Sequence, residues 1–203
     1  MSNDCRILEC AQKLFSRFGL KSVTMDDIAR EIGMSKKTIY QQYADKDKLV
    51  NAYFDKEKQE QISMMEDISK NSKNAIEEIL NAMQFMGKTF SRINPNLFYD
   101  MHKYHHDSWN QFKAFKEEYL MKYVIRNLEK GKSEGLYRAD INNKTLARLR
   151  LEQVEMAMNP GIFPPEQFNH VEVQIQLLDH FLHGIATLKG HKLINKYRQI
   201  GEE

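Results

Sequence analysis

The sequence predicts an all-α fold, and three observations support this. The chain has 203 residues but only 9 glycines and 4 prolines, the residue types that most often interrupt helices. Apolar residues recur at three- and four-residue steps, and few runs alternate apolar with polar residues as strands do. The composition, 41% hydrophobic and 29% charged, is that of a globular protein that can fill a core.

The first expected helix covers residues 7–18. Its apolar residues fall on one helical face, and Gly19 follows directly, as glycine often does at a helix end. The residues of this face are Ile7, Leu8, Ala11, Leu14, Phe15 and Phe18.

A second and a third helix follow, each with a recognisable start. Thr24 can cap the second helix with Asp27 as its capping-box partner, and Gly33 can end that helix. Ser35 can cap the third helix only two residues later. Because two short helices joined by a tight, glycine-containing turn form a helix-turn-helix, the sequence predicts a three-helix head of this kind.

The third helix has an exposed face that is suited to DNA. If Ile39 faces the core, Lys37 and Gln41 lie at the middle of the opposite face, flanked by Thr38 and Tyr40. Lysine can donate to guanine, glutamine can pair with adenine, and hydroxyl groups can hold phosphates. Taken singly, these residues are better explained as an ordinary solvated surface. Together with the capped helix pair, they favour DNA contact.

Charge alone does not indicate nucleic-acid binding. The formal net charge is +2, and residues 1–50 hold nine Lys or Arg against seven Asp or Glu. A net charge this small excludes a basic protein that coats nucleic acid without selection. The weak bias of residues 1–50 does not by itself support DNA binding, because a DNA-binding surface needs positive charge gathered on one face.

Residues 7–50 resemble the tetracycline-repressor (TetR) family of transcriptional regulators. The segments that carry the resemblance are VTMDDIA at 23–29, GMSKKTIY at 33–40 and YADKDKL at 43–49. One departure is Tyr43, where the family more usually has phenylalanine. The resemblance implies a DNA-binding domain at residues 1–48 and a larger helical-bundle domain for ligand binding and dimerisation at residues 49–203.

The resemblance also implies which head residues bind DNA. Lys46 would bind a phosphate at the positive end of the fourth helix. The full implied set is Thr24, Lys36, Lys37, Thr38, Tyr40, Gln41 and Lys46.

Beyond residue 50 we expect five or six further helices. Residues 55–61 are polar all round, so they read as a solvated stretch of a long fourth helix that links head and body. Methionine and aromatic stripes later in the body are most simply core, but such side chains also line pockets for apolar ligands. In the TetR family the body carries a small-molecule pocket. The resemblance implies a small apolar or aromatic ligand and a candidate lining of Phe85, Phe90, Tyr99, His102, Trp109, Phe112 and Met156.

A cluster of His102, His105, His106 and Asp107 has two interpretations. Two histidines three or four residues apart can share a metal ion on one helix face. The competing interpretation is a polar helix end, which we favour because no second ligand pair is evident elsewhere. We therefore expect no metal site.

The last apolar stripes can be buried core or a subunit interface. In TetR-like proteins the last two long helices, here roughly residues 143–158 and 168–188, build a four-helix interface between two copies. On this resemblance we expect a homodimer.

The sequence thus predicts a dimeric, ligand-responsive transcriptional regulator, a repressor that binds a palindromic double-stranded operator and is released by a small molecule. The alternative is a DNA-binding regulator without a small-molecule ligand, controlled by a protein partner or by abundance. We expect no enzyme activity, no catalytic residues and no cofactor, because the sequence has no phosphate-binding glycine loop, nucleophile elbow or zincin motif. Without a signal peptide or membrane span, we expect a cytoplasmic protein that makes no membrane contact.

Overall fold

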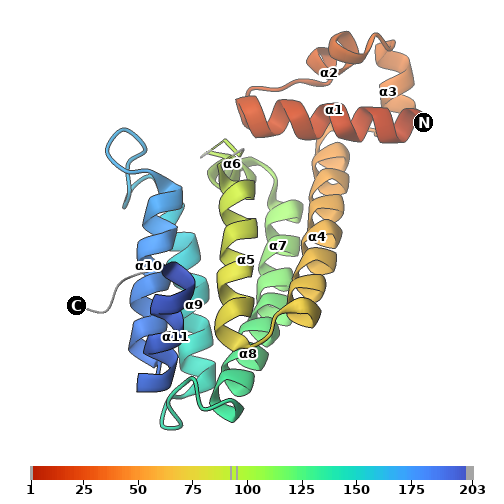
Figure 1. The fold of residues 1–203 in the computed structure, drawn as a ribbon. Helices are drawn as coiled ribbons and strands as arrows, with labels where there is room; N and C mark the ends of the chain where they lie inside the picture. Colours follow the sequence, from red (N-terminus) through yellow and green to blue (C-terminus); the bar gives the residue numbers. More distant parts are fainter. Residues whose placement is uncertain (1, 92, 95, 200–203) are drawn as a thin grey trace. The chain divides into compact units, whose positions relative to one another are not determined.

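In the computed structural model, residues 2–91, 93–94 and 96–199 are described, and every regular element in this part is a helix (Figure 1). The predicted all-α class is confirmed. In chain order the helices are α1 (Asn3–Phe18), α2 (Met25–Ile32), α3 (Lys36–Gln42), α4 (Lys46–Asn71), α5 (Ala75–Phe90), α6 (Leu97–Tyr104), α7 (His106–Phe115), the π-helix η1 (Lys116–Leu120), α8 (Met121–Ser133), α9 (Asn143–Ala157), α10 (His170–Ile185) and α11 (Leu188–Arg198).

The helices fold into two compact units. Unit 1 comprises Met1–Ser63 and Arg92–Ala114, and unit 2 comprises Met64–Ser91 and Phe115–Glu203. Helix α4 begins in the first unit and ends in the second. This division reflects packing and does not test the functional boundary expected after residue 48, which stays a prediction.

The core of unit 1 joins the three-helix head to α4 and α6. Fully buried residues on each of the first four helices meet in one cluster, and Leu97 and Met101 of α6 belong to it. Burying such apolar side chains is the main stabilising term for a small helical unit. The buried residues that the first four helices contribute include Ile7, Phe15, Ile28, Ile39 and Leu49.

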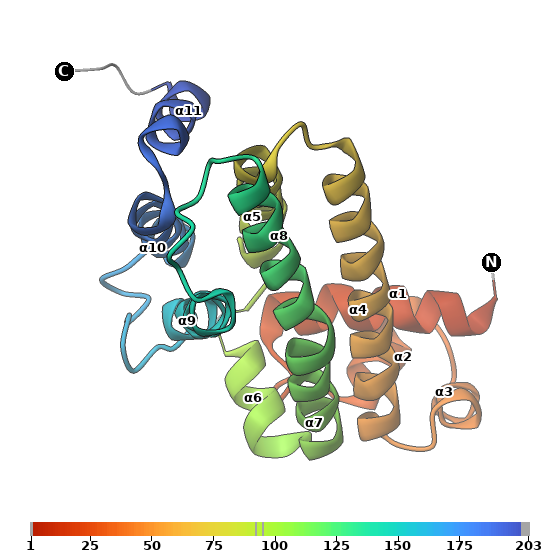
Figure 2. The same ribbon diagram turned by 90° about the horizontal axis from the view of Figure 1, so that it is seen from below.

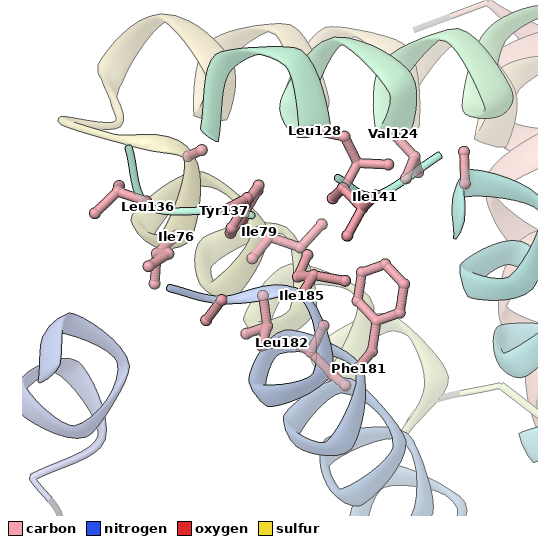
Figure 3. Close-up of a cluster of buried hydrophobic side chains, with 14 of the residues drawn as sticks. Ile76, Ile79, Val124, Leu128, Leu136, Tyr137, Ile141, Phe181, Leu182 and Ile185 are labelled. Carbon is pink, nitrogen blue, oxygen red and sulfur yellow. The ribbon is translucent and has the colours of Figure 1, made fainter. Parts of the chain in front are cut away.

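The core of unit 2 lies between α5, α8 and α10 (Figure 3). Val124 and Leu128 of α8 belong to the same cluster as Ile79 of α5 and Leu182 of α10. In both ribbon views α5 lies beside α8, and α9 lies beside α10 (Figure 2). Unit 2 is therefore a helical bundle, as the sequence predicts.

The expected number of helices after α4 was too low. The described residues contain α5 to α11 instead of five or six helices. The π-helix η1 divides the apolar stripe at 109–124, because a π-turn shifts the 3.6-residue period. Thr187 caps α11 directly after α10 ends, so the apolar residues of the two helices form one continuous stripe in the sequence.

The polar stretch at 55–61 lies in α4 as predicted, but it is not fully solvated. Glu57 is half-buried and accepts a hydrogen bond of 2.6 Å from Gln12 Nε2 of α1. None of the helices in the described ranges combines the length and the apolar character that crossing a membrane requires.

Candidate nucleic-acid interface

The N-terminus of α2 is fixed by the predicted capping box, which is confirmed. The Asp27 amide donates to Thr24 Oγ1 at 3.2 Å, and the Thr24 amide donates to Asp27 Oδ2 at 2.9 Å. The Thr24 hydroxyl also donates to Asp27 Oδ2 at 2.6 Å, and this bond lowers the pKa of the Asp27 carboxyl. Thr24 is exposed, but its hydroxyl proton is already engaged within the cap.

The turn between α2 and α3 has the geometry of the predicted helix-turn-helix (Figure 1). Gly33 ends α2 with a φ of +65°, a left-handed conformation that residues with a Cβ rarely adopt. Ser35 then caps α3, its Oγ accepting from the Thr38 amide at 3.1 Å. These local bonds set the direction in which α3 leaves the turn.

The two faces of α3 differ as predicted. Ile39 is fully buried, whereas Lys37 and Gln41 are exposed and 48% of Tyr40 is accessible. Thr38 departs from the prediction, because it is half-buried and its hydroxyl lies 2.8 Å from that of Ser35. The exposed surface of α3 thus carries an ammonium, an amide and a phenol within two turns.

The three lysines of the predicted set have different environments. Lys37 forms no ion pair with any described residue, whereas the Lys36 ammonium pairs with Asp26 of α2. Lys46 is half-buried, and its ammonium donates to the Leu20 carbonyl. Burial lowers the pKa of Lys46, although Asp100 nearby acts in the opposite direction. A phosphate contact by Lys46 therefore requires it to exchange its bond to Leu20.

Residues of α6 and of the segments on either side of it support this head, which the sequence reasoning missed. Asp100 Oδ2 accepts from the Lys21 amide at 2.9 Å, and His105 Nδ1 bonds to Asp47 Oδ1. The Asn94 amide donates to the Ser16 carbonyl at 2.7 Å. These contacts hold both the loop after α1 and the start of α4.

Comparison with known proteins agrees with this geometry. Residues 7–53 match the family described as bacterial regulatory proteins, tetR family. The HTH-type transcriptional regulator YvaF of Bacillus subtilis (strain 168) is 30% identical over 186 residues, which cover 91% of this chain and 96% of YvaF. The chain belongs to the TetR family of transcriptional regulators.

Solved structures of other regulators share the fold over nearly the whole chain. A regulator from Agrobacterium tumefaciens has a TM-score of 0.76 at 17% identity, covering 91% of this chain and 97% of that one. The fatty acid degradation regulator FadR from Bacillus halodurans has a TM-score of 0.72 at 11% identity, with the same coverage. The predicted fold, a helix-turn-helix head followed by a helical bundle, is confirmed.

The candidate ligand residues of this TetR-family chain are distributed over both units. Trp109 lies between two of them in unit 1, with ring centroids 4.8 Å from His102 and 5.5 Å from Phe112, and 52% of Tyr99 is exposed. The other candidates belong to unit 2: Phe85 and Met156 are half-buried there, and the Phe90 side chain lies outside the described residues.

The histidine cluster of this regulator takes part in packing. His105 is buried against Asp47, and the His102 ring lies against Trp109. Within the described ranges, no group of three or more His, Cys, Asp or Glu side chains is arranged to hold a metal ion.

Proposed function

We propose that this TetR-family regulator is a homodimeric repressor that binds a roughly palindromic double-stranded operator through α3 and is released by a small molecule bound in its body. The proposal assigns DNA binding to residues 1–48, and ligand binding and dimerisation to residues 49–203. The observation that carries it is the exposed face of α3, held on a head with capped helices and a buried core.

Lys37 and Gln41 are the proposed readers of the operator sequence. Lys37 is exposed and has no ion-pair partner among the described residues, so its ammonium is available to a guanine edge. The amide of Gln41 is one turn further along the helix and can pair with adenine. The other proposed contacts, chiefly to phosphates, are Thr24, Lys36, Thr38, Tyr40 and Lys46.

Exposed apolar residues on α9 and α10 support the homodimer. Leu149 is 46% exposed and Ile175 is 38% exposed, although both lie on helices whose other faces are buried. In a dimer with twofold symmetry, two copies of α3 would enter major grooves about one DNA turn apart.

The course of the chain supports coupling between ligand and operator. After α5 in unit 2, the chain contributes residues 92–114 to unit 1 and then returns. A ligand that binds better when the heads are wrongly spaced must weaken DNA binding by the same factor. Coupling of about 1–3 kcal/mol would change operator affinity roughly 5- to 150-fold.

The first prediction concerns operator recognition. Sites are selected from a random DNA pool with the purified protein, and affinities for the best site are measured across a salt series. Because each base contact contributes about 1–3 kcal/mol, we expect Lys37→Ala and Gln41→Ala each to lose roughly 5- to 150-fold in affinity and to relax the sequence preference.

Lys122→Ala is the control, because it removes an exposed lysine on α8 in unit 2. It should bind the selected site like the parent. The proposal fails if no palindromic site is enriched, or if Lys37→Ala binds as tightly as Lys122→Ala.

A further inference from the structure

Arg150 of α9 is a buried cation without a counter-ion. Only 5% of its surface is exposed, Nη2 lies 3.8 Å from the Met83 sulfur of α5, and Nη1 has no hydrogen-bond partner. No described carboxylate forms an ion pair with it. Two residues earlier, Arg148, whose side chain is 43% exposed, pairs with Glu117 of η1. The other buried cation of this region, Lys116, pairs with two glutamates at 2.7 and 2.9 Å.

Burial of an unpaired guanidinium is energetically unfavourable. A charge removed from water loses its hydration, and proteins normally compensate with an opposite charge. The pKa of Arg150 is lowered to about 10, and desolvation is its only cause. Even so, the group stays charged at neutral pH and remains available to an anion.

Two glutamine side chains on the same side of α9 have unpaired acceptors. Gln174 of α10 is fully buried, and its Nε2 donates to the Val154 carbonyl at 2.8 Å. Since a carbonyl can only accept, this bond fixes the amide orientation and leaves Oε1 unpaired. Gln153 Oε1, one helical turn after Arg150, is also buried and unpaired.

A third unpaired acceptor belongs to His170 of α10, which contacts α9 one helical turn beyond Gln153. His170 Nδ1 lies 2.6 Å from the Ala157 carbonyl, so Nδ1 must carry the proton. In the neutral ring Nε2 is then an acceptor, and it too is buried without a partner. A Cβ on Gly87 of α5 would lie 3.6 Å from Val171, which places α5 against the start of α10. Helices α5, α9 and α10 therefore bring one unpaired cation and three unpaired acceptors to one region of unit 2.

We propose that the effector of this regulator is a monoanionic carboxylate with an apolar body, and that its carboxylate pairs with Arg150. The planar guanidinium matches a carboxylate through two parallel hydrogen bonds, and a single unpaired cation balances a single negative charge. Hydroxyl or amide hydrogens on the same molecule would bind the acceptors of Gln153 and Gln174. This inference rests on the proposed ligand response and names the chemical class of the ligand.

The test compares the parent with Arg150→Met and the control Arg148→Met. Thermal unfolding and binding to the selected operator are measured with short, medium and long straight-chain carboxylates, their hydroxy-substituted forms, phenyl-substituted carboxylates and the matching alcohols. We expect at least one carboxylate to raise the parent's Tm by several degrees and to weaken operator binding, while its alcohol does neither. Arg148→Met should keep both responses and Arg150→Met should lose both.

The ligand-free variants provide a second readout. If Arg150 serves a ligand, Arg150→Met removes an unpaired charge and should be at least as stable as the parent, with unchanged operator affinity. Arg150→Lys keeps the charge but loses the planar guanidinium that donates two parallel hydrogen bonds. This variant should therefore respond to the carboxylate more weakly than the parent does.

Three results would overturn the inference: a ligand-free Arg150→Met that is less stable than the parent or fails to fold, a panel in which no carboxylate acts, or alcohols as effective as carboxylates. A parent that binds its operator but ignores carboxylates contradicts only this inference. A parent that selects no operator contradicts the proposed function itself.

Discussion

At the scale of single residues, Glu57 links the packing of unit 1 to pH. Its carboxylate is half-buried between α4 and α1, where it accepts a hydrogen bond from Gln12. Burial raises the pKa of Glu57, and the neighbouring charge of Glu60 raises it further. The folded protein therefore holds this proton more tightly than the unfolded chain does. The free energy of unfolding must fall as pH rises from about 4.3, the unfolded pKa, through the raised folded value.

The prediction is that Glu57→Gln stabilises the protein at pH 7 and has no effect near pH 4. Glutamine can keep the bond to Gln12 without the poorly solvated charge. Because 1 kcal/mol shifts Tm by roughly 2–4 °C in a protein of this size, we expect a rise of less than about 4 °C. Thermal unfolding between pH 4 and 8 measures it, with the exposed Glu129→Gln as control. A difference that is the same at every pH would contradict this account.

Among single residues, some contacts could be predicted from the sequence and others could not. The Thr24–Asp27 cap was predictable because both partners lie within four residues and use standard chemistry. The burial of Arg150 was not, because α9 also carries the more accessible, paired Arg148 and periodicity does not distinguish the two arginines. Nor could a residue pattern reveal that Asp100 accepts from the Lys21 amide, since 79 residues separate them.

At the scale of helices, the close packing of α8 depends on Gly131. The residue lies within the helix, and a Cβ there would be 2.0 Å from the ring of Tyr137. That ring cannot easily move, because it is almost fully buried and its hydroxyl donates to Asn127 at 3.2 Å. The sequence could not predict this contact, because the contact depends on how the chain returns after α8.

The prediction for this helix is that Gly131→Ala destabilises the protein by about 1–3 kcal/mol, the usual effect of overpacking a core. Chemical denaturation measures the change. Gly184→Ala is the matched control, because Gly184 is also helical but nothing lies within 4 Å of its Cβ position. Alanine favours helix there, so the control should gain up to about 1 kcal/mol. Equal changes in stability in both variants would show that helix propensity and backbone freedom, and not the contact with Tyr137, decide the effect.

At the scale of the whole molecule, the sequence pattern alone does not predict which apolar residues are exposed. The wide stripe of α10 was compatible with either a buried core or a subunit interface. The structure buries part of it, including Leu178 and Leu182, and leaves Ile175 exposed. Leu149 on α9 is also exposed, and contiguous apolar patches on a protein surface commonly mark an interface. We therefore expect the interface between two copies to include Leu149 and Ile175, which is tested in solution.

The prediction is that Leu149→Glu converts the proposed homodimer to a monomer, because a carboxylate buried at a symmetric interface would face its own copy without a partner. Sedimentation measures the mass, and operator binding should weaken for the full palindrome but not for an isolated half-site. Leu188→Glu tests the location, since Leu188 on α11 is 84% exposed and lies outside the proposed interface. It should remain dimeric. If Leu188→Glu dissociates while Leu149→Glu does not, α11 forms the contact, and the spacing of the two recognition helices must be derived from that interface.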